Sequence, residues 1–212
     1  MTDHDRYAAG TGPDLVCATP ADTELLAAVI AAAFFPLDPC RWLVPDNAAR
    51  RAVLPGYFAL YVEHALSDGQ VWTTPDRAAV ALWLPVGETP PDPPTGYEER
   101  LAAVTGQWLD RFQVLDAAFD KHHPAGFIHH HLAILATRPD RQGGGIGTAL
   151  LHDYHARLDR DGIPAYLEAA NERTRRLYLE HGYRDHGTPL HLPDGPTMWP
   201  MVRQPQTPDG TR

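Results

Sequence analysis

The stretch Arg138–Leu151, "RPDRQGGGIGTALL", places four glycines directly before an apolar run. Glycine costs backbone entropy on folding and weakens helices, so its concentration at the start of a predicted helix needs a reason. The first turn of a helix has unpaired N–H groups and a partial positive charge, which together favour an anion. Glycines allow a bulky phosphate to approach those N–H groups closely. The stretch therefore predicts a phosphate-binding loop.

Spacing excludes the two commonest nucleotide-binding loops. A Walker A loop has a lysine and then Ser or Thr after its last glycine, whereas Gly147 is followed by Thr148 and Ala149. The dinucleotide fingerprint Gly-x-Gly-x-x-Gly/Ala fails whether it starts at Gly143 or at Gly145. The structural alternative is a tight strand-to-helix turn that needs positive φ, and one or two glycines would satisfy it. Four glycines favour the phosphate interpretation.

Strand and helix patterns alternate around the glycines. Apolar alternation predicts a strand over 126–138, and the 3.6-residue period after it predicts an amphipathic helix over 145–162. A second strand is predicted over 163–170 and a second helix over 171–182. This order is a βαβα unit, which is typical of an α/β protein.

The rest of the chain predicts one mixed domain without an internal linker. We assign the α/β (α+β) class, with a domain over 14–203 and flexible tails over 1–13 and 204–212, which are rich in Gly, Pro and polar residues. The further predicted elements are a strand at 14–19, helices at 20–35 and 47–68, a hairpin of strands at 69–75 and 78–87, a Pro-rich loop at 88–96, a long helical region at 97–123, and two strands within 183–204.

Composition and charge limit the partners. The 212 residues are 43% hydrophobic, enough for one buried core, and carry a net charge of -9 from 27 acidic and 18 basic residues. This sign argues against nucleic acid and is compatible with a cationic substrate or with simple solubility. No secretory signal is visible, and the apolar run Leu25–Phe35 is too short to span a membrane. Cys17 and Cys40 form neither a disulfide framework nor a zinc spacing. We expect a cytoplasmic protein without membrane or nucleic-acid partners.

Gln142–Gly147, "QGGGIG", fits the pattern Gln/Arg-x-x-Gly-x-Gly/Ala, and here the sequence resembles the GNAT (GCN5-related) family of acetyl-CoA-dependent N-acetyltransferases. "LAILATRPD" (132–140) is similar to the family's fourth strand and the turn after it. "PAYLEAANERTRRLYLEHGY" (164–183) is similar to its second signature. The resemblance covers about residues 128–184. More narrowly, "VWTTPDRAAVALWLP", "PAYLE" and "GPTMWPM" resemble puromycin N-acetyltransferase and related actinobacterial enzymes.

The resemblance implies a fold and an activity. The fold would be the GNAT acyl-CoA N-acyltransferase fold, a mixed central sheet of about six to seven strands flanked by helices. The activity would be transfer of an acetyl group from acetyl-CoA to a primary amine of a small molecule by direct attack. An antibiotic or an aminonucleoside-like metabolite is one such acceptor, which would make the protein an antibiotic-resistance enzyme. The alternatives are a protein or peptide N-acetyltransferase and a non-catalytic acyl-CoA-binding regulatory module. The protein would be a monomer or a homodimer.

The resemblance also implies where CoA would bind. Leu135 and Thr137 would lend backbone groups to the pantetheine arm. Asn171 would contact CoA, although its place before "ERTRRLY" also makes it a good helix N-cap. Gly143 and Gly144 occupy unspecified positions of the pattern and would give the pyrophosphate extra room. The N–H groups implied for the pyrophosphate are those of Gln142, Gly143, Gly144, Gly145, Ile146, Gly147 and Thr148.

Tyr178 matches the family's general acid, which protonates the departing CoA thiolate; its structural alternative is an ordinary helix aromatic. For the general base, His131 and Glu168 stay as equal candidates, and the alternative role of Glu168 is a structural ion pair. Strand alternation puts His129 and His131 on one face and His130 on the other. Because neighbouring histidines on a strand point apart and no carboxylate follows at ligand spacing, no metal site is predicted.

Aromatic residues in the first half of the chain predict an acceptor pocket for an aromatic or bulky amine. Most of them would belong to the core, and a few would line a cleft together with acids such as Asp38 or Glu63. The aromatic residues are Phe34, Phe35, Trp42, Tyr57, Phe58 and Tyr61.

Overall fold

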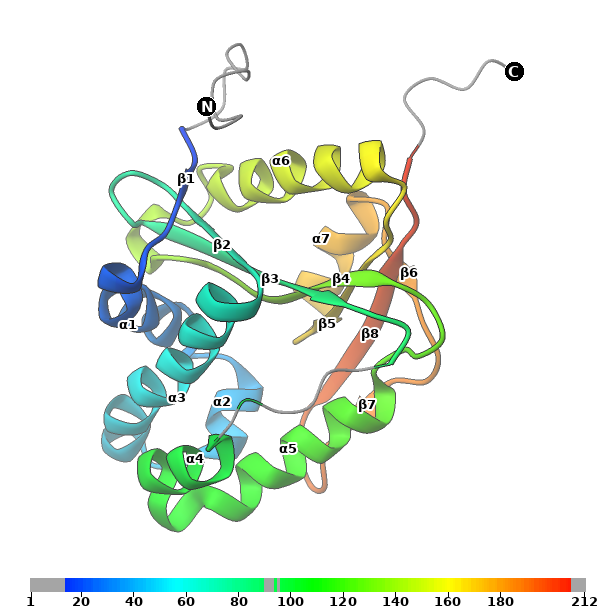
Figure 1. The fold of residues 1–212 in the computed structure, drawn as a ribbon. Coiled ribbons are helices and arrows are strands. Elements are labelled where there is room, and N and C mark those ends of the chain that lie inside the picture. The colour runs from blue at the N-terminus through cyan, green and yellow to red at the C-terminus, as the bar shows by residue number, and fades with distance from the viewer. Residues whose placement is uncertain (1–13, 90–93, 95, 207–212) are drawn as a thin grey trace.

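A computed structural model describes residues 14–89, 94 and 96–206. Within them one sheet has the strand order β1-β2-β3-β4-β5-β8-β6, and β7 pairs with β8 (Figure 1). All neighbours are antiparallel except β4 and β5, which run parallel. The strands are β1 (Val16–Cys17), β2 (Gln70–Thr73), β3 (Ala79–Val86), β4 (His129–Thr137), β5 (Ala165–Ala169), β6 (Arg184–Asp185), β7 (Leu190–His191) and β8 (Thr197–Arg203).

Helices cover both faces of the sheet, with α1 to α5 on one side and α6 and α7 on the other (Figure 1). Two buried clusters result, one on each face, and β3 contributes to both because alternate residues point to opposite sides. The helices are α1 (Thr23–Phe34), α2 (Asp38–Leu43), α3 (Asn47–Asp68), α4 (Tyr97–Thr105), α5 (Leu109–His122), α6 (Ile146–Asp161) and α7 (Glu172–Glu180), with short 3-10 turns η1 (Pro20–Asp22), η2 (Gly106–Trp108) and η3 (Pro139–Arg141).

The α/β class is confirmed, and the predicted helix over 47–68 is α3 itself. Three details differ. The helical region 97–123 is broken at Gly106, whose φ of +53° does not fit a continuous helix. The segment 183–204 forms three strands instead of two, because Leu190–His191 makes its own pairing with β8. Helix α2 was not predicted. Residues 1–13 and 207–212 of the expected tails lie outside the described residues.

A bulge in β4 changes the simple alternation expected for this strand. Leu82 of β3 is paired with Ile134 and Trp83 with Leu132, so Ala133 has no partner on β3. The extra residue shifts the side-chain phase and bends the strand. Beyond the bulge, Ile134 belongs to the cluster under α1 to α5, whereas Leu135 packs on the α6 side.

The two parallel strands separate after a short contact. β4 has nine residues and β5 has five, yet only His130 with Ala165 and His131 with Tyr166 are paired. Beyond these pairs the strands diverge, leaving the C-terminal half of β4 without a neighbour on that side (Figure 1). The unpaired edge gives an extended ligand access to backbone N–H and C=O groups in the middle of the sheet.

Candidate active site

The glycine loop joins β4 to α6 and contains two residues in a backbone conformation that only glycine adopts easily. Gly143 has φ +81° and Gly145, the N-cap of α6, has φ +77°. The strand-to-helix turn therefore explains two of the four glycines on conformational grounds. Gly144 and Gly147 do not have positive φ, and a Cβ at either would meet its nearest described neighbour at 3.6 Å or more. The fold of the chain itself does not require glycine at these two positions.

The N–H groups of the loop remain available. Ala149 is the first helix residue whose N–H is satisfied by the chain, at 3.0 Å from the Gly145 carbonyl. The N–H groups from Gly143 to Thr148 donate to no described residue outside the helix. Gln142 is turned back toward the strand, where its Nε2 donates to the Thr137 carbonyl at 3.0 Å. An exposed row of free donors at a helix N-terminus, bordered by two unfilled Cβ positions, fits a phosphate group.

A cavity lies where β4 and β5 separate. It encloses about 860 Å³ including its solvent-open mouth. Its lining combines the C-terminal half of β4 with the end of β5, α7, and helices α1, α2, α3 and α5. From the sheet side the lining residues are Leu132, Ala133, Ile134, Leu135, Glu168, Ala170, Thr174, Tyr178 and Met198. Leu135, one of the two strand residues expected near CoA, is therefore at the cavity, whereas Thr137 is not among the lining residues.

Tyr178 projects into this cavity from α7. The residue is 9% exposed, and burial raises the pKa of its phenol above the usual range, so the phenol carries a proton at neutral pH. The hydroxyl donates to no described residue, and the ring is fixed by an edge-on contact with Tyr183 at 5.5 Å. The helix that carries it is anchored by Asn171, whose Oδ1 accepts from the Thr174 N–H at 2.9 Å. The capping role expected for Asn171 is thus present.

His131 and Glu168, the two candidate bases, are in direct contact. Nε2 of His131 lies 2.9 Å from Oε2 of Glu168, which is two residues beyond Tyr166, the partner of His131 on β5. The Glu168 side chain is 6% exposed and its Oε1 has no partner among the described atoms. Burial opposes its ionisation most strongly, but His131, Tyr166 and His123 together lower the pKa of Glu168 below its usual value. A buried carboxylate that stays ionised, with one free oxygen beside a cavity, can accept a proton or bind a cation.

Two further histidines lie behind this pair. His123, after the end of α5, has Nε2 3.0 Å from Nε2 of His129, whose Nδ1 lies 3.0 Å from the Phe127 carbonyl. Burial lowers the pKa of both rings, to about 4 for His123. A carbonyl only accepts, so neutral His129 is protonated at Nδ1 and His123 is the donor between them. No motif in the sequence pointed to His123 as part of the site. In the described part of the chain no group of histidines, cysteines and acids is arranged to hold a metal.

The aromatic residues of the first half divide between cavity and core. Phe34, Tyr57, Phe58 and Tyr61 line the cavity, as does Phe119 from α5. Phe35 instead lies under the guanidinium of Arg50, and Trp42 donates from its ring N–H to the Pro193 carbonyl at 2.9 Å. The acids suggested for this pocket are not part of it. Asp38 is exposed beside Arg41, and Glu63 is paired with Arg100.

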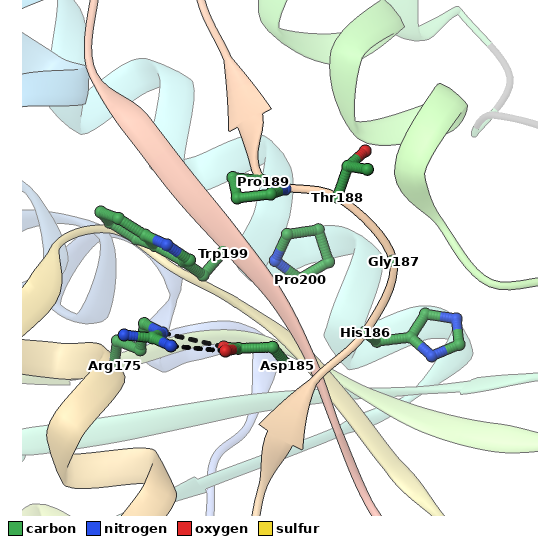
Figure 2. Close-up of a pocket in the computed structure, with 8 residues that line it drawn as sticks. All are labelled: Arg175, Asp185, His186, Gly187, Thr188, Pro189, Trp199 and Pro200. Carbon is green, nitrogen blue, oxygen red and sulfur yellow. Dashed lines mark hydrogen bonds and ion pairs between the residues drawn. The ribbon is translucent and has the colours of Figure 1, made fainter.

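A second pocket lies between α7 and the segment from β6 to β8 (Figure 2). Two of its charged side chains are paired with each other, because Nε and Nη2 of Arg175 donate to both carboxylate oxygens of Asp185 at 2.8 and 2.5 Å. Trp199 and Pro200 of β8 form its wall (Figure 2). None of its lining residues has a buried side-chain polar atom without a hydrogen-bond partner. The cavity at the split between β4 and β5 is therefore the candidate active site.

Comparison with known proteins agrees with this geometry. The acetyltransferase (GNAT) domain model matches residues 111–185, the segment from α5 to β6. A crystal structure of histone acetyltransferase HPA2 and related acetyltransferase from Corynebacterium glutamicum is 28% identical, with a TM-score of 0.68, and covers 93% of this chain and 99% of its own. Arylalkylamine N-acetyltransferase 2 from Aedes aegypti is 12% identical, with a TM-score of 0.60 and coverages of 91% and 99%. Agmatine N-acetyltransferase is 16% identical, with a TM-score of 0.56 and coverages of 90% and 99%.

These matches support the GNAT acetyltransferase family and confirm the GNAT fold expected from the sequence. The observed sheet has eight strands where about six to seven were expected, because the two-residue strands β1, β6 and β7 are included. The GNAT domain model and the 28% identical acetyltransferase structure support an N-acetyltransferase. GNAT acetyltransferases use acetyl-CoA as co-substrate. No described helix is both long and apolar enough to cross a membrane.

Proposed function

We propose that this enzyme transfers the acetyl group of acetyl-CoA to the primary amine of a small molecule by direct attack. One observation carries the proposal: a single cavity, opened by the separation of β4 and β5, contains a protonated phenol and an ionised carboxylate. The glycine loop supports it by offering free N–H groups to a pyrophosphate near the same strand. Leu135 and Thr137 would bind the pantetheine arm, and the loop from Gln142 to Thr148 would bind the phosphates.

The side chains divide the proton transfers between them. Glu168, supported by His131, would accept a proton from the attacking amine, directly or through water. Tyr178 would donate a proton to the departing thiolate, because the raised pKa of its phenol keeps that proton on the hydroxyl at neutral pH. The carbonyl carbon exchanges its C–S bond for a C–N bond, and the products are the amide and free CoA thiol. No covalent acyl-enzyme is needed, and neither Cys17 nor Cys40 lies in either signature.

The part of the cavity lined by α1, α2, α3 and α5, here called the acceptor half, favours binding of an amine with an apolar body. Tyr57, Phe58, Tyr61 and Phe119 offer rings against which a carbon skeleton or a cation can pack. An antibiotic or aminonucleoside-like amine, as the puromycin N-acetyltransferase resemblance suggests, belongs to this class. We also propose a cytoplasmic location, in line with the two unpaired cysteines.

Release of free CoA thiol from acetyl-CoA, measured across a panel of amines, tests the proposal. We expect turnover with small amines and little with peptides that present an N-terminal or lysine amine. Turnover with peptides alone would favour a protein N-acetyltransferase. Tight acetyl-CoA binding without thiol release for any amine would favour a regulatory module and contradict the proposed activity.

A further inference from the structure

The phenol at the end of α7 has no hydrogen bond that directs its hydroxyl. Among the described residues the Tyr178 hydroxyl has no hydrogen-bond partner, so the direction of the phenol depends on what its ring packs against. Its ring meets that of Tyr183 edge-on, with 5.5 Å between the centroids and 65° between the planes. A catalytic side chain has to be held within about 0.5 Å of its productive position by residues that are themselves fixed. Tyr183 can hold Tyr178 in this way only if its own ring is fixed.

The backbone at the end of α7 places the two tyrosines together. Gly182 has φ +87° and its N–H donates to the Leu179 carbonyl at 3.2 Å, while the Tyr183 N–H donates to the Tyr178 carbonyl at 3.0 Å. These two hydrogen bonds form a Schellman motif, in which a residue of the last helical turn often contacts the residue after the glycine. Tyr178 and Tyr183 occupy these two positions, so the end of the helix itself brings their rings into contact.

A buried hydrogen bond fixes the far end of Tyr183. The residue is 0% exposed, and its hydroxyl lies 3.0 Å from Nε2 of His155 on α6. His155 is also buried, and its ring meets that of Trp83 on β3 edge-on at 6.0 Å. Burial raises the pKa of Tyr183 and lowers the pKa of His155 to about 3, so both groups are neutral at pH 7. A chain of contacts therefore runs from the sheet through α6 to Tyr183 and ends at Tyr178.

We propose that Tyr183 is a positioning residue for the proton transfer to the thiolate: its hydrogen bond to His155 fixes the ring against which Tyr178 packs, and so the direction of the Tyr178 hydroxyl. A phenylalanine at position 183 could make the same backbone bonds and the same ring contact, so the hydroxyl of Tyr183 serves only the bond to His155. This inference rests on the proposed function, in which Tyr178 is the general acid.

Tyr154 offers a matched control for Tyr183. It belongs to the same buried cluster and is 2% exposed, and its hydroxyl lies 2.8 Å from Nδ1 of His130. Its ring stacks on Trp83 at 4.2 Å, and among the described aromatic contacts none joins it to Tyr178. Tyr154→Phe and Tyr183→Phe thus each remove one buried hydrogen bond between a tyrosine and a histidine, but only the second loosens the ring beside Tyr178.

The first test measures kcat by thiol release with the best amine of the panel, and the Kd of acetyl-CoA by calorimetry. Tyr183→Phe should lower kcat by about three- to tenfold, as expected for residues in contact, and leave the Kd unchanged. In a Tyr178→Phe background the same change should cause no further loss of kcat, because the group that it positions is absent. Tyr154→Phe should lower the melting temperature about as much as Tyr183→Phe but keep the wild-type kcat. His155→Phe breaks the same bond from α6 and should repeat the result of Tyr183→Phe.

The flip rate of the Tyr178 ring gives a second measurement that needs no turnover. Rotation of a packed ring requires its neighbours to move aside, and NMR of tyrosine-labelled protein measures the rate of this rotation. Tyr183→Phe should raise the flip rate of the Tyr178 ring by about twofold or more over wild type, in line with the coupling between residues in contact. Tyr154→Phe should leave it unchanged.

The outcomes separate this inference from the proposed function. A wild-type kcat in Tyr183→Phe, a loss that Tyr154→Phe matches, or a loss that recurs undiminished in the Tyr178→Phe background would overturn the positioning role and leave the acetyltransferase proposal intact. If the wild-type protein releases no thiol with any amine, the proposed function is contradicted and the flip rate decides. A faster Tyr178 ring in Tyr183→Phe alone would then support the positioning contact, and an unchanged flip rate overturns it in either case.

Discussion

Gly147 offers a substitution that should change stability and acetyl-CoA binding in opposite directions. It is the second residue of α6, does not have positive φ, and a Cβ there would lie 3.6 Å from Thr137 Oγ1 and 3.9 Å from Leu135 Cδ2, which are ordinary contacts. Replacing a helical glycine by glutamate gains about 0.5–1 kcal/mol of helix propensity. An acid in the first turn adds about 0.3–1 kcal/mol through the helix dipole. Gly147→Glu should therefore raise the melting temperature by about 2–8 °C.

Binding should respond in the other direction if the pyrophosphate rests on this turn. A carboxylate about 5 Å from one phosphate charge repels it by roughly 3 kcal/mol at an effective dielectric constant of about 20, which corresponds to at least a hundredfold in Kd. Calorimetric titration with acetyl-CoA and a thermal melt measure the two effects on one sample. Gly147→Ala is the control: it should keep the stability gain and most of the affinity. A Gly147→Glu variant that binds acetyl-CoA within threefold of wild type would refute the phosphate cradle.

Three further substitutions test other parts of the molecule. Tyr178→Phe should lower kcat by about a hundredfold or more while leaving the Kd for acetyl-CoA unchanged by calorimetry; full-rate turnover would exclude the acid role. Glu168→Gln should lower kcat/KM by about 10²–10⁴-fold and remove the rising acid limb of its pH profile, whereas a retained limb would point to His131 or water. His155 is hydrogen-bonded to Tyr183, and burial lowers the pKa of its imidazole to about 3. Below pH 6.5 this imidazole therefore binds a proton in the unfolded chain but not in the folded one, so the folded state loses stability as the pH is lowered. Between pH 7 and pH 5 this lowers the free energy of unfolding, measured with urea, by about 2 kcal/mol. In His155→Phe the decrease over the same range should be smaller by that amount, and an unchanged decrease would contradict the lowered pKa of His155.

Periodicity predicted the parts of the fold whose residues repeat regularly. Helix α3 was found to the residue because its apolar positions recur over six turns, and the unit from β4 to α7 was found because glycine and asparagine mark its helix starts. The break at Gly106 had a local signal, a glycine within a helical pattern, but such glycines are often tolerated. The bulge at Ala133 had none, since one extra small residue in an apolar run leaves the composition of the strand unchanged.

The acceptor half of the site could not be read from the sequence, because core and cavity use the same residue types. Phe34 lines the cavity while its neighbour Phe35 lies under Arg50, and only the packing of α1 against α3 decides between them.

The question of the general base also changes once the strands are paired. His131 and Glu168 are 37 positions apart, and the sequence left them as separate candidates for the general base. The parallel register that pairs His131 with Tyr166 places Glu168 two residues further along the same face of β5, within 2.9 Å of the imidazole. Groups this close share their protons, so the pH profile reports the pair and not either residue alone. Glu168 lines the cavity and has the unpartnered oxygen. We therefore expect its carboxylate to accept the proton of the attacking amine, while the imidazole of His131 holds the carboxylate in place.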